Sequence, residues 1–160
     1  GKWSADTIIS SIPWALWKNF TPLPDDIQKD IDSLVSISID VDYVPETLDD
    51  DSHWIYEPDE TIAHHRSLLR SNFCTDSKGY WTETNSKRSG APNNWRHHNE
   101  YAYPVNTLEK PEAVKRILNW AIQYGVLGVG RWGKWEHMNS DIVVDEALNA
   151  VDELFDSGKI

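Results

Sequence analysis

The first apolar run of the chain predicts a short buried strand. Residues 6–12 read Asp-Thr-Ile-Ile-Ser-Ser-Ile, and Pro13 follows them. A run without strict alternation is typical of a strand that is covered on both faces, whereas a strand exposed on one face alternates. Proline then ends the strand, because it has no backbone N–H to donate to a neighbouring strand.

Between residues 24 and 43 the period of the apolar positions changes from that of a helix to that of a strand. A proline and two aspartates open the segment, and Ile27, Ile31 and Leu34 follow at helical spacing. This pattern predicts a helix that ends near residue 34, with the acids at its positive end. From 35 to 43 every second residue is apolar, which predicts a half-buried antiparallel strand.

The rest of the chain predicts more strands in the middle and two helices near the end. The middle and the two ends therefore read as different units, and the fold class is α+β with an antiparallel sheet. The expected elements are strands at 53–57, 62–73 and 79–84, a polar excursion at 85–99, an extended segment at 100–105, a helix at 111–124, a strand at 126–129 and a helix at 141–155 capped by Asp141.

Composition narrows the function classes. The net charge of −11 over 160 residues argues against a nucleic-acid partner, because little basic surface is available to neutralise phosphates. No apolar stretch is long enough to span a membrane, so no membrane partner is expected. Cys74 is the only cysteine and no signal segment is present, which predicts a cytoplasmic protein without disulfides.

Nine tryptophans are an unusual number for a chain of this length. Indole rings stack on sugars and on heteroaromatic ligands, but they also fill hydrophobic cores. For any single tryptophan, packing in the core is the first interpretation. A free-standing, tryptophan-rich carbohydrate-binding module is nevertheless one hypothesis for the whole chain.

A glycine-rich segment near the end formally matches the dinucleotide-binding fingerprint. Gly128-Val-Gly130-Arg-Trp-Gly133 has the G-x-G-x-x-G spacing, but no helix with an apolar stripe begins directly after it. A loop carrying Arg131, followed by a helix start near Asp141, could instead hold an anion. An ordinary glycine-rich turn with a surface arginine fits the same residues equally well.

The histidines are candidate metal ligands, and two arginines are candidate phosphate-binding residues. Adjacent histidines, such as His64 and His65, point to opposite faces of a strand and do not make a chelate, so no metal site is expected. Arg66 and Arg70 share a face if the segment is extended. Together they could grip a diphosphate, or they could pair with the many acids of the chain.

Several segments follow one another in an order that matches a known family. Residues 5–13 look like a strand that returns to a flavin domain. Residues 53–59, with His64-His-Arg66 and Ser71-Asn-Phe73, resemble central strands of a substrate domain, and residues 100–105 (Glu-Tyr-Ala-Tyr-Pro-Val) are similar to a tyrosine-proline segment.

The last of these segments is the most specific. Gly130-Arg-Trp-Gly-Lys-Trp135, followed by Asn139-Ser-Asp141, looks like a second flavin-binding segment. In this order, the segments resemble the last third of UDP-galactopyranose mutase-like proteins, which are amine-oxidase-like FAD-dependent flavoproteins. The resemblance covers nearly the whole chain and implies that it is the carboxy-terminal part of such a protein.

The resemblance also implies an architecture. Residues 1–13 would be a strand returning to the FAD domain, and residues 14–124 a substrate-binding domain built on an antiparallel sheet. Residues 125–160 would be the second flavin-contacting segment and the terminal helix. The glycine-rich fingerprint of the family's amino-terminal half is absent here. The expected partner is therefore a missing amino-terminal FAD-binding region, without which the fragment could self-associate and would neither hold FAD nor be active.

Residue roles follow from the same resemblance. Arg66 and Tyr103 would bind an anionic small-molecule substrate, a nucleotide sugar in the mutases. Arg131, Trp135, Asn139 and Asp141 would contact the FAD cofactor. In that family of isomerases the cofactor supplies the nucleophile, while the protein orients the sugar and neutralises charge.

The chain departs from the family pattern next to its arginine. His65 stands where the mutases have a tyrosine, and Leu68 and Leu69 replace charged and histidine residues. These departures leave an FAD-dependent amine-oxidase-like oxidoreductase open as an alternative.

Overall fold

The computed structural model describes residues 5–92, 94–156 and 158, and these form two compact units. The first unit comprises Gly1–Val35 and Pro104–Ile160, and the second comprises Ser36–Tyr103. The contacts thus place residues 14–35 and 104–124 with the terminal segments, whereas the sequence-based boundaries grouped them with the central sheet. The assignment of either unit to a substrate or to a flavin stays a prediction.

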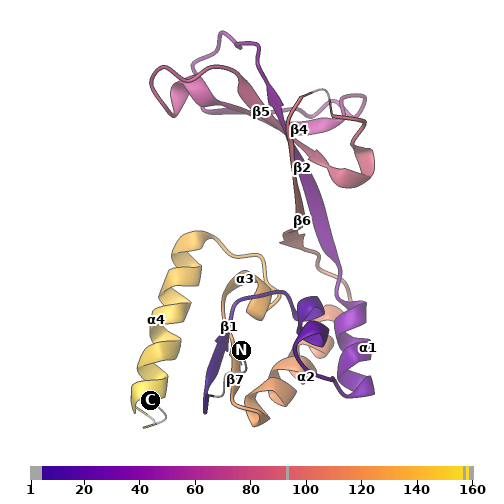
Figure 1. Ribbon diagram of the computed structural model, residues 1–160, viewed down its shortest axis with the longest axis vertical. Helices are drawn as coiled ribbons and strands as arrows, with labels where there is room; N and C mark the ends of the chain where they lie inside the picture. Colours follow the sequence, from indigo (N-terminus) through magenta and orange to yellow (C-terminus); the bar gives the residue numbers. More distant parts are fainter. Residues whose placement is uncertain (1–4, 93, 157, 159–160) are drawn as a thin grey trace. The chain divides into compact units, whose positions relative to one another are not determined.

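The first unit is built around two short parallel strands with helices beside them. Strand β1 (Ile8–Ser10) pairs with β7 (Val126–Gly128), so the first and last predicted strands do meet (Figure 1). The helical elements are η1 (Trp14–Asn19), α1 (Asp25–Ser33), α2 (Lys110–Gln123), α3 (Gly130–Gly133) and α4 (Ser140–Asp156).

Large apolar side chains from several of these elements form the core of the first unit. Trp14, Ile117 and Trp135 are almost completely inaccessible to water. The indole Nε1 of Trp14 donates to the carbonyl of Gly133 at 2.9 Å, which ties η1 to α3. For these two tryptophans, core packing is therefore the correct interpretation.

Two local predictions in the first unit were wrong. The expected glycine-rich loop around Arg131 is a short helical turn, α3, because Gly130 adopts a φ of +67° that lets the chain turn directly after β7. The cap of α4 is Asn139 rather than Asp141: the carbonyl of Asn139 accepts the first helical hydrogen bond, from Val143 at 3.1 Å. Asp141 instead lies in the first turn of the helix.

The second unit is a five-stranded antiparallel sheet with strand order β3-β4-β5-β2-β6 (Figure 1). The hydrogen bonds from Tyr43 to Trp95 and from Val105 to Val35 show that β6 runs antiparallel to β2. The predicted α+β class with an antiparallel sheet is confirmed. Its strands are β2 (Ser36–Val44), β3 (Trp54–Tyr56), β4 (His64–Leu69), β5 (Tyr80–Asn85) and β6 (Arg96–Pro104), with η2 (Arg70–Asn72) and η3 (Ser86–Arg88) as short helical turns.

Two predictions in the second unit were wrong. The strand expected over 62–73 spans only β4, because the chain turns into η2 after Leu69. The polar excursion expected at 85–99 contains the first four residues of β6. That part of the strand is polar because Arg96 and His98 pair with acids of β2, a pattern that apolar periodicity does not detect.

No helix within the described residues is both long enough and apolar enough to span a membrane.

Candidate functional site

The predicted substrate arginine is held by an acid of the neighbouring strand. Arg66 on β4 lies opposite Glu83 on β5, and its Nε and Nη2 donate to one oxygen of that carboxylate at 2.8 and 2.6 Å. On its other side Arg66 lies opposite Tyr56, and its guanidinium is 5.9 Å from the centre of that ring. Of the two interpretations of Arg66, pairing with an acid is therefore correct for part of its guanidinium.

The environment of Arg66 keeps it charged. Burial opposes the charge, but the hydrogen bond and the negative charge of Glu83 outweigh it and raise the pKa of Arg66. A guanidinium has five N–H donors, and Glu83 accepts only two of them. A strand bulge at this point brings His65 within 3.8 Å of the same carboxylate oxygen.

Tyr103, the other predicted substrate residue, lies on the same face of the sheet. It borders a cavity of about 310 Å³ together with Ile37 and Ile39 of β2. Ile39 lies two residues from Val41, which pairs with Glu83, so these side chains share the face that carries Arg66. Tyr103 is also close enough to contribute to the raised pKa of Arg66. The two predicted substrate residues therefore lie on the same face of the sheet, although Arg66 does not line this cavity.

Arg88 also lines this cavity, although it was not among the residues predicted from the sequence. Its Nη2 donates to the carbonyls of Glu60 and Ile62 at 2.6 and 2.9 Å. Arg88 lies in η3, within the segment that was predicted to be an excursion from the sheet. No local sequence pattern predicts that Arg88 lines a cavity, because its position depends on how the chain continues from η3 into β6.

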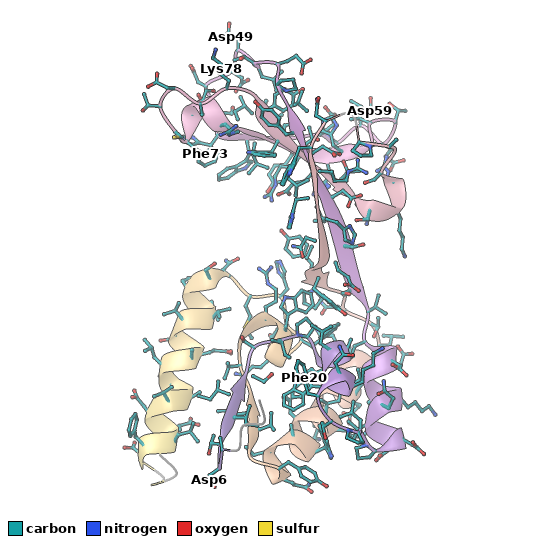
Figure 2. All side chains as sticks on the ribbon, viewed as in Figure 1. Asp6, Phe20, Asp49, Asp59, Phe73 and Lys78 are labelled. Carbon is teal, nitrogen blue, oxygen red and sulfur yellow. The ribbon has the colours of Figure 1, made fainter. Side chains whose placement is uncertain are left out.

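Arg70 does not join Arg66 in a diphosphate clamp. The strand ends before Arg70, and its guanidinium lies over the rings of Tyr43 and Trp81, at 5.7 and 5.5 Å from their centres. Its Nη1 also donates to the carbonyl of Lys78, which is labelled in Figure 2. Of the two interpretations left open for Arg66 and Arg70, the structure does not favour a joint diphosphate grip, because that grip requires an extended chain through residue 70.

The predicted flavin-contacting residues lie together in the first unit, between β7 and α4. Arg131 is half-buried in α3 and donates from Nη2 to the carbonyl of Met138 at 2.8 Å. Asn139 and Asp141 are exposed at the amino terminus of the 17-residue helix α4. The first N–H groups of an α-helix have no partner within the helix, and they favour anions.

Trp135, the fourth predicted cofactor residue, is buried beneath this turn. It is 1% exposed, and its ring packs edge-on against Trp132 at 5.0 Å. Its φ of 51° is unusual for a residue with a bulky side chain, and its indole nitrogen has no hydrogen-bond partner. The structure therefore places Trp135 in the core, where it supports the turn from behind.

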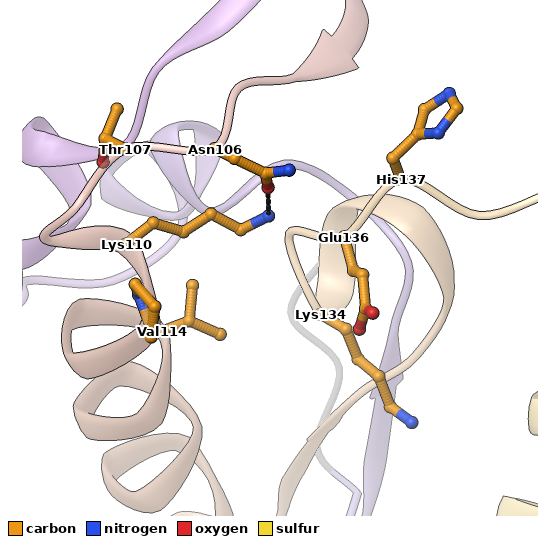
Figure 3. A pocket seen from close by; sticks show the side chains of 8 residues that line it. Asn106, Thr107, Lys110, Val114, Lys134, Glu136 and His137 are labelled. Carbon is orange, nitrogen blue, oxygen red and sulfur yellow. Dashed lines mark hydrogen bonds between the residues drawn. The ribbon is translucent and has the colours of Figure 1, made fainter.

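A cavity of about 440 Å³ opens between the start of α2 and the segment after α3 (Figure 3). Lys110 and Asn106 lie on one side, with Lys110 Nζ donating to the side chain of Asn106 at 2.7 Å. Glu136 and His137 lie on the other side, next to Lys134, which forms an ion pair with Glu146 at 2.8 Å. No sequence motif marks this cavity, because its two sides are at least twenty residues apart along the chain.

The opposite face of the β2–β6 pair carries ionic contacts around the buried carboxylate of Asp40. Asp40 accepts a hydrogen bond from His98 at 2.7 Å, and Arg96 pairs with Asp42 at 2.6 Å. Ser86 lies 3.5 Å from the same ring nitrogen of His98 that contacts Asp40. Because both groups share one nitrogen, this cluster is not arranged to relay a proton from the serine to the aspartate. No set of three metal-ligating side chains was found among the described residues.

Comparison with known proteins shows which solved structure has a similar fold. No protein-family model matches the chain, and no curated protein matches its sequence. Among solved structures, reduced UDP-galactopyranose mutase superimposes with a TM-score of 0.69 and 19% sequence identity. The match covers 84% of this chain but only 37% of the mutase. The chain therefore shares the fold of a part of UDP-galactopyranose mutase and spans little more than a third of its length.

Proposed function

We propose that this chain is the carboxy-terminal, substrate-binding and flavin-contacting part of a UDP-galactopyranose mutase-like enzyme that acts on a nucleotide sugar or a related substrate. The observation that carries the proposal is the fold, since one superposition on a mutase includes 84% of the chain. The order of the four sequence segments supports the same conclusion. Because the match covers only 37% of the mutase, the proposed activity requires an additional FAD-binding region.

Exposed apolar side chains in the first unit support the proposal that another protein region packs against it. On α4, Val144 and Leu148 are four residues apart, and each is more than half exposed. On β1, Ile8 and Ile9 are both more than two-fifths exposed. Helices and strands of a complete domain bury such faces, and contiguous exposed apolar surface marks an interaction site. The proposed occupant is the amino-terminal FAD-binding region.

Within the second unit, Arg66 and Tyr103 are the proposed substrate residues. The pairing with Glu83 fixes one edge of the Arg66 guanidinium, and the remaining N–H donors can then bind a phosphate. Tyr103 can donate a hydrogen bond from its hydroxyl to the same anionic group. Arg88 borders the cavity next to Tyr103 and adds positive charge there.

Within the first unit, the turn around Arg131 fits a contact with an anionic or electron-rich part of FAD. Gly128 and Gly133 approach so closely that a Cβ on Gly128 would lie 2.4 Å from the carbonyl oxygen of Gly133, which fixes the turn in front of α4. Arg131, Asn139 and Asp141 then surround the amino terminus of a long helix. FAD, when bound, would supply the redox or nucleophilic chemistry that none of these side chains provides.

Flavin retention tests this proposal. The 160-residue chain and a longer protein with the encoded upstream region restored are purified, and flavin absorbance is compared. We expect only the longer protein to retain FAD, and Arg131→Ala to weaken retention because it removes a positive charge from the turn. Lys115→Ala removes an exposed positive charge from α2 of the same unit and should leave flavin content unchanged.

Substrate assays then separate the mutase from its oxidoreductase alternative. The restored protein, with its flavin reduced, is incubated with UDP-galactopyranose and with other nucleotide sugars, and products are separated chromatographically. Isomerised sugar nucleotide is the expected result. Substrate-dependent reduction of oxidised flavin without isomerisation would instead identify an oxidoreductase.

A further inference from the structure

A set of aromatic rings lies on the face of the second unit that carries Arg66, at a different position along the strands. Tyr43 and Trp81 are directly opposite each other on β2 and β5, with ring centres 5.1 Å apart. Trp95 follows at 5.3 Å from Trp81, and the ring of His97 is 6.1 Å from that of Trp95. We name these four side chains the aromatic row.

The aromatic row borders a groove that is open to solvent. The groove has a volume of about 260 Å³, and Trp95 is 54% exposed beside it. The two indoles are inclined at 69° to each other and pack edge to face. The side chains that line the groove are Val41, Leu68, Trp81, Glu83, Trp95 and His97.

Polar groups are present among the apolar walls. Glu83 lines the groove, and Arg66 donates both of its hydrogen bonds to a single oxygen of this carboxylate. The second oxygen can therefore accept a hydrogen bond from a ligand. The ring of His97 is nearly parallel to that of Trp95, at 11°, and it adds a nitrogen donor or acceptor.

We propose that this groove binds a pyranose ring of a neutral glycan. A pyranose has an apolar face of C–H groups that can pack on an indole, and hydroxyls at its edge that can reach Glu83 and His97. A flat heteroaromatic ligand fits less well, because it is best held between parallel rings, and these indoles are 69° apart. An anionic ligand would meet the free oxygen of Glu83.

Arg70 orders the rings beside the groove. Its guanidinium lies over both Tyr43 and Trp81, and such cation–π contacts hold the two rings in place. Because Arg70 already lies over Trp81, the pyranose packs on the exposed indole of Trp95, which rests on this ordered pair of rings and loses little side-chain entropy on binding. The groove is lined neither by Arg66 nor by Tyr103 and needs no flavin, so its glycan binding can be tested separately from the proposed function, although Glu83 contacts Arg66.

The test uses the 160-residue chain and the longer restored protein. Neutral tetrasaccharides of glucose, xylose, mannose and galactose are titrated separately, and binding is followed by tryptophan fluorescence and by the indole N–H signals in nitrogen-15 spectra. We expect at least one glycan to shift the signals of Trp81 and Trp95 in both proteins. Trp95→Ala should weaken that binding by about tenfold or more, and Trp95→Tyr should restore part of it.

Phe20→Ala is the matched control, because Phe20 is an exposed aromatic residue of the other unit. It should leave glycan binding unchanged, and the fold of each variant is checked by circular dichroism. The proposal is overturned if no glycan shifts these signals, or if Trp95→Ala binds as tightly as the unaltered chain. It is also overturned if only a proline-rich peptide binds, or if the restored protein binds no glycan because its upstream region covers the groove.

Discussion

At the scale of single residues, buried charges decide how the central sheet responds to acid. Burial favours the neutral form of Asp40, but the hydrogen bond from His98 and the charge of Arg96 outweigh that effect. Together they hold the pKa of Asp40 below its ordinary value. The folded-state pKa is therefore lower than the unfolded one, and ionised Asp40 stabilises the folded sheet at neutral pH.

This leads to a prediction about acid stability. The contribution of Asp40 is complete well above its ordinary pKa of about 3.9, and it is lost as the pH falls through that value towards the lower folded pKa. Asp40→Asn should lower the stability at pH 7 and flatten its pH dependence between about pH 5 and 3. Urea unfolding at several pH values measures both effects.

Asp50→Asn provides a comparison for Asp40. The pKa of Asp50 is also lowered, by hydrogen bonds from Ser52, but Asp50 lies in an exposed loop. Its replacement should change the stability at pH 7 much less than Asp40→Asn does. Equal losses from the two variants would contradict the assigned role of the buried network.

Some single-residue features could be predicted from the sequence, and others could not. Arg66 and Tyr103 were expected to serve one site, and they do share a face of the sheet. The partner of Arg66, Glu83, is 17 positions away, and their contact depends on the register of β4 against β5. Likewise, the sequence marks Trp135 as an aromatic residue beside a glycine turn, but only the packing shows that it is buried.

At the scale of elements, close glycine contacts join β1, β7 and α3. A Cβ on Gly133 would lie 2.4 Å from the carbonyl oxygen of Ser10 and 2.9 Å from the carbonyl carbon of Gly128. Both neighbours are backbone atoms that cannot rotate away. The short parallel pair therefore depends on glycine at this position.

We predict that Gly133→Ala destabilises the chain by roughly 2 kcal/mol or more, as an overpacked core substitution does. Gly90→Ala is the matched control, because no atom lies within 4 Å of the Cβ it would add. Thermal unfolding of both variants measures the difference. A Gly133→Ala variant as stable as the control would show that β1 and α3 do not approach as closely as described.

The cap of α4 gives a second prediction at this scale. Asn139 occupies the position where Asn, Asp and Ser are preferred, so Asn139→Ala should cost about 1 kcal/mol of stability. Asn149→Ala, at an exposed position inside the same helix, should cost less. Urea unfolding of the two variants distinguishes a cap from an ordinary helical position.

The elements that the sequence predicted best are those with long, regular apolar patterns. Helices α1, α2 and α4 and strand β2 lie within one or two residues of the expected bounds, because burial of one face imposes a clear period. The start of β6 was missed because charge pairing, not apolar burial, holds Arg96 and His98 against β2. Turn α3 was missed because a four-residue element carries no periodicity.

At the scale of the whole molecule, the exposed apolar side chains of β1 and α4 make self-association of the isolated chain an expected property. Val144→Lys combined with Leu148→Lys places two charges on that helix face, and should shift the chain towards the monomer in analytical ultracentrifugation. Leu108→Lys, at a position 96% exposed and outside the apolar face, is the control. An unchanged sedimentation profile for the double variant would exclude this face as the contact.

The proposed role of this chain rests on its being one part of a flavoprotein. The most direct test is the flavin content of the restored longer protein compared with that of the 160-residue chain, measured by absorbance after purification and again after Arg131→Ala. We expect FAD to stay bound only to the longer protein, and the substitution to reduce its flavin content. A restored protein that purifies without flavin and does not take up added FAD would contradict the proposed role.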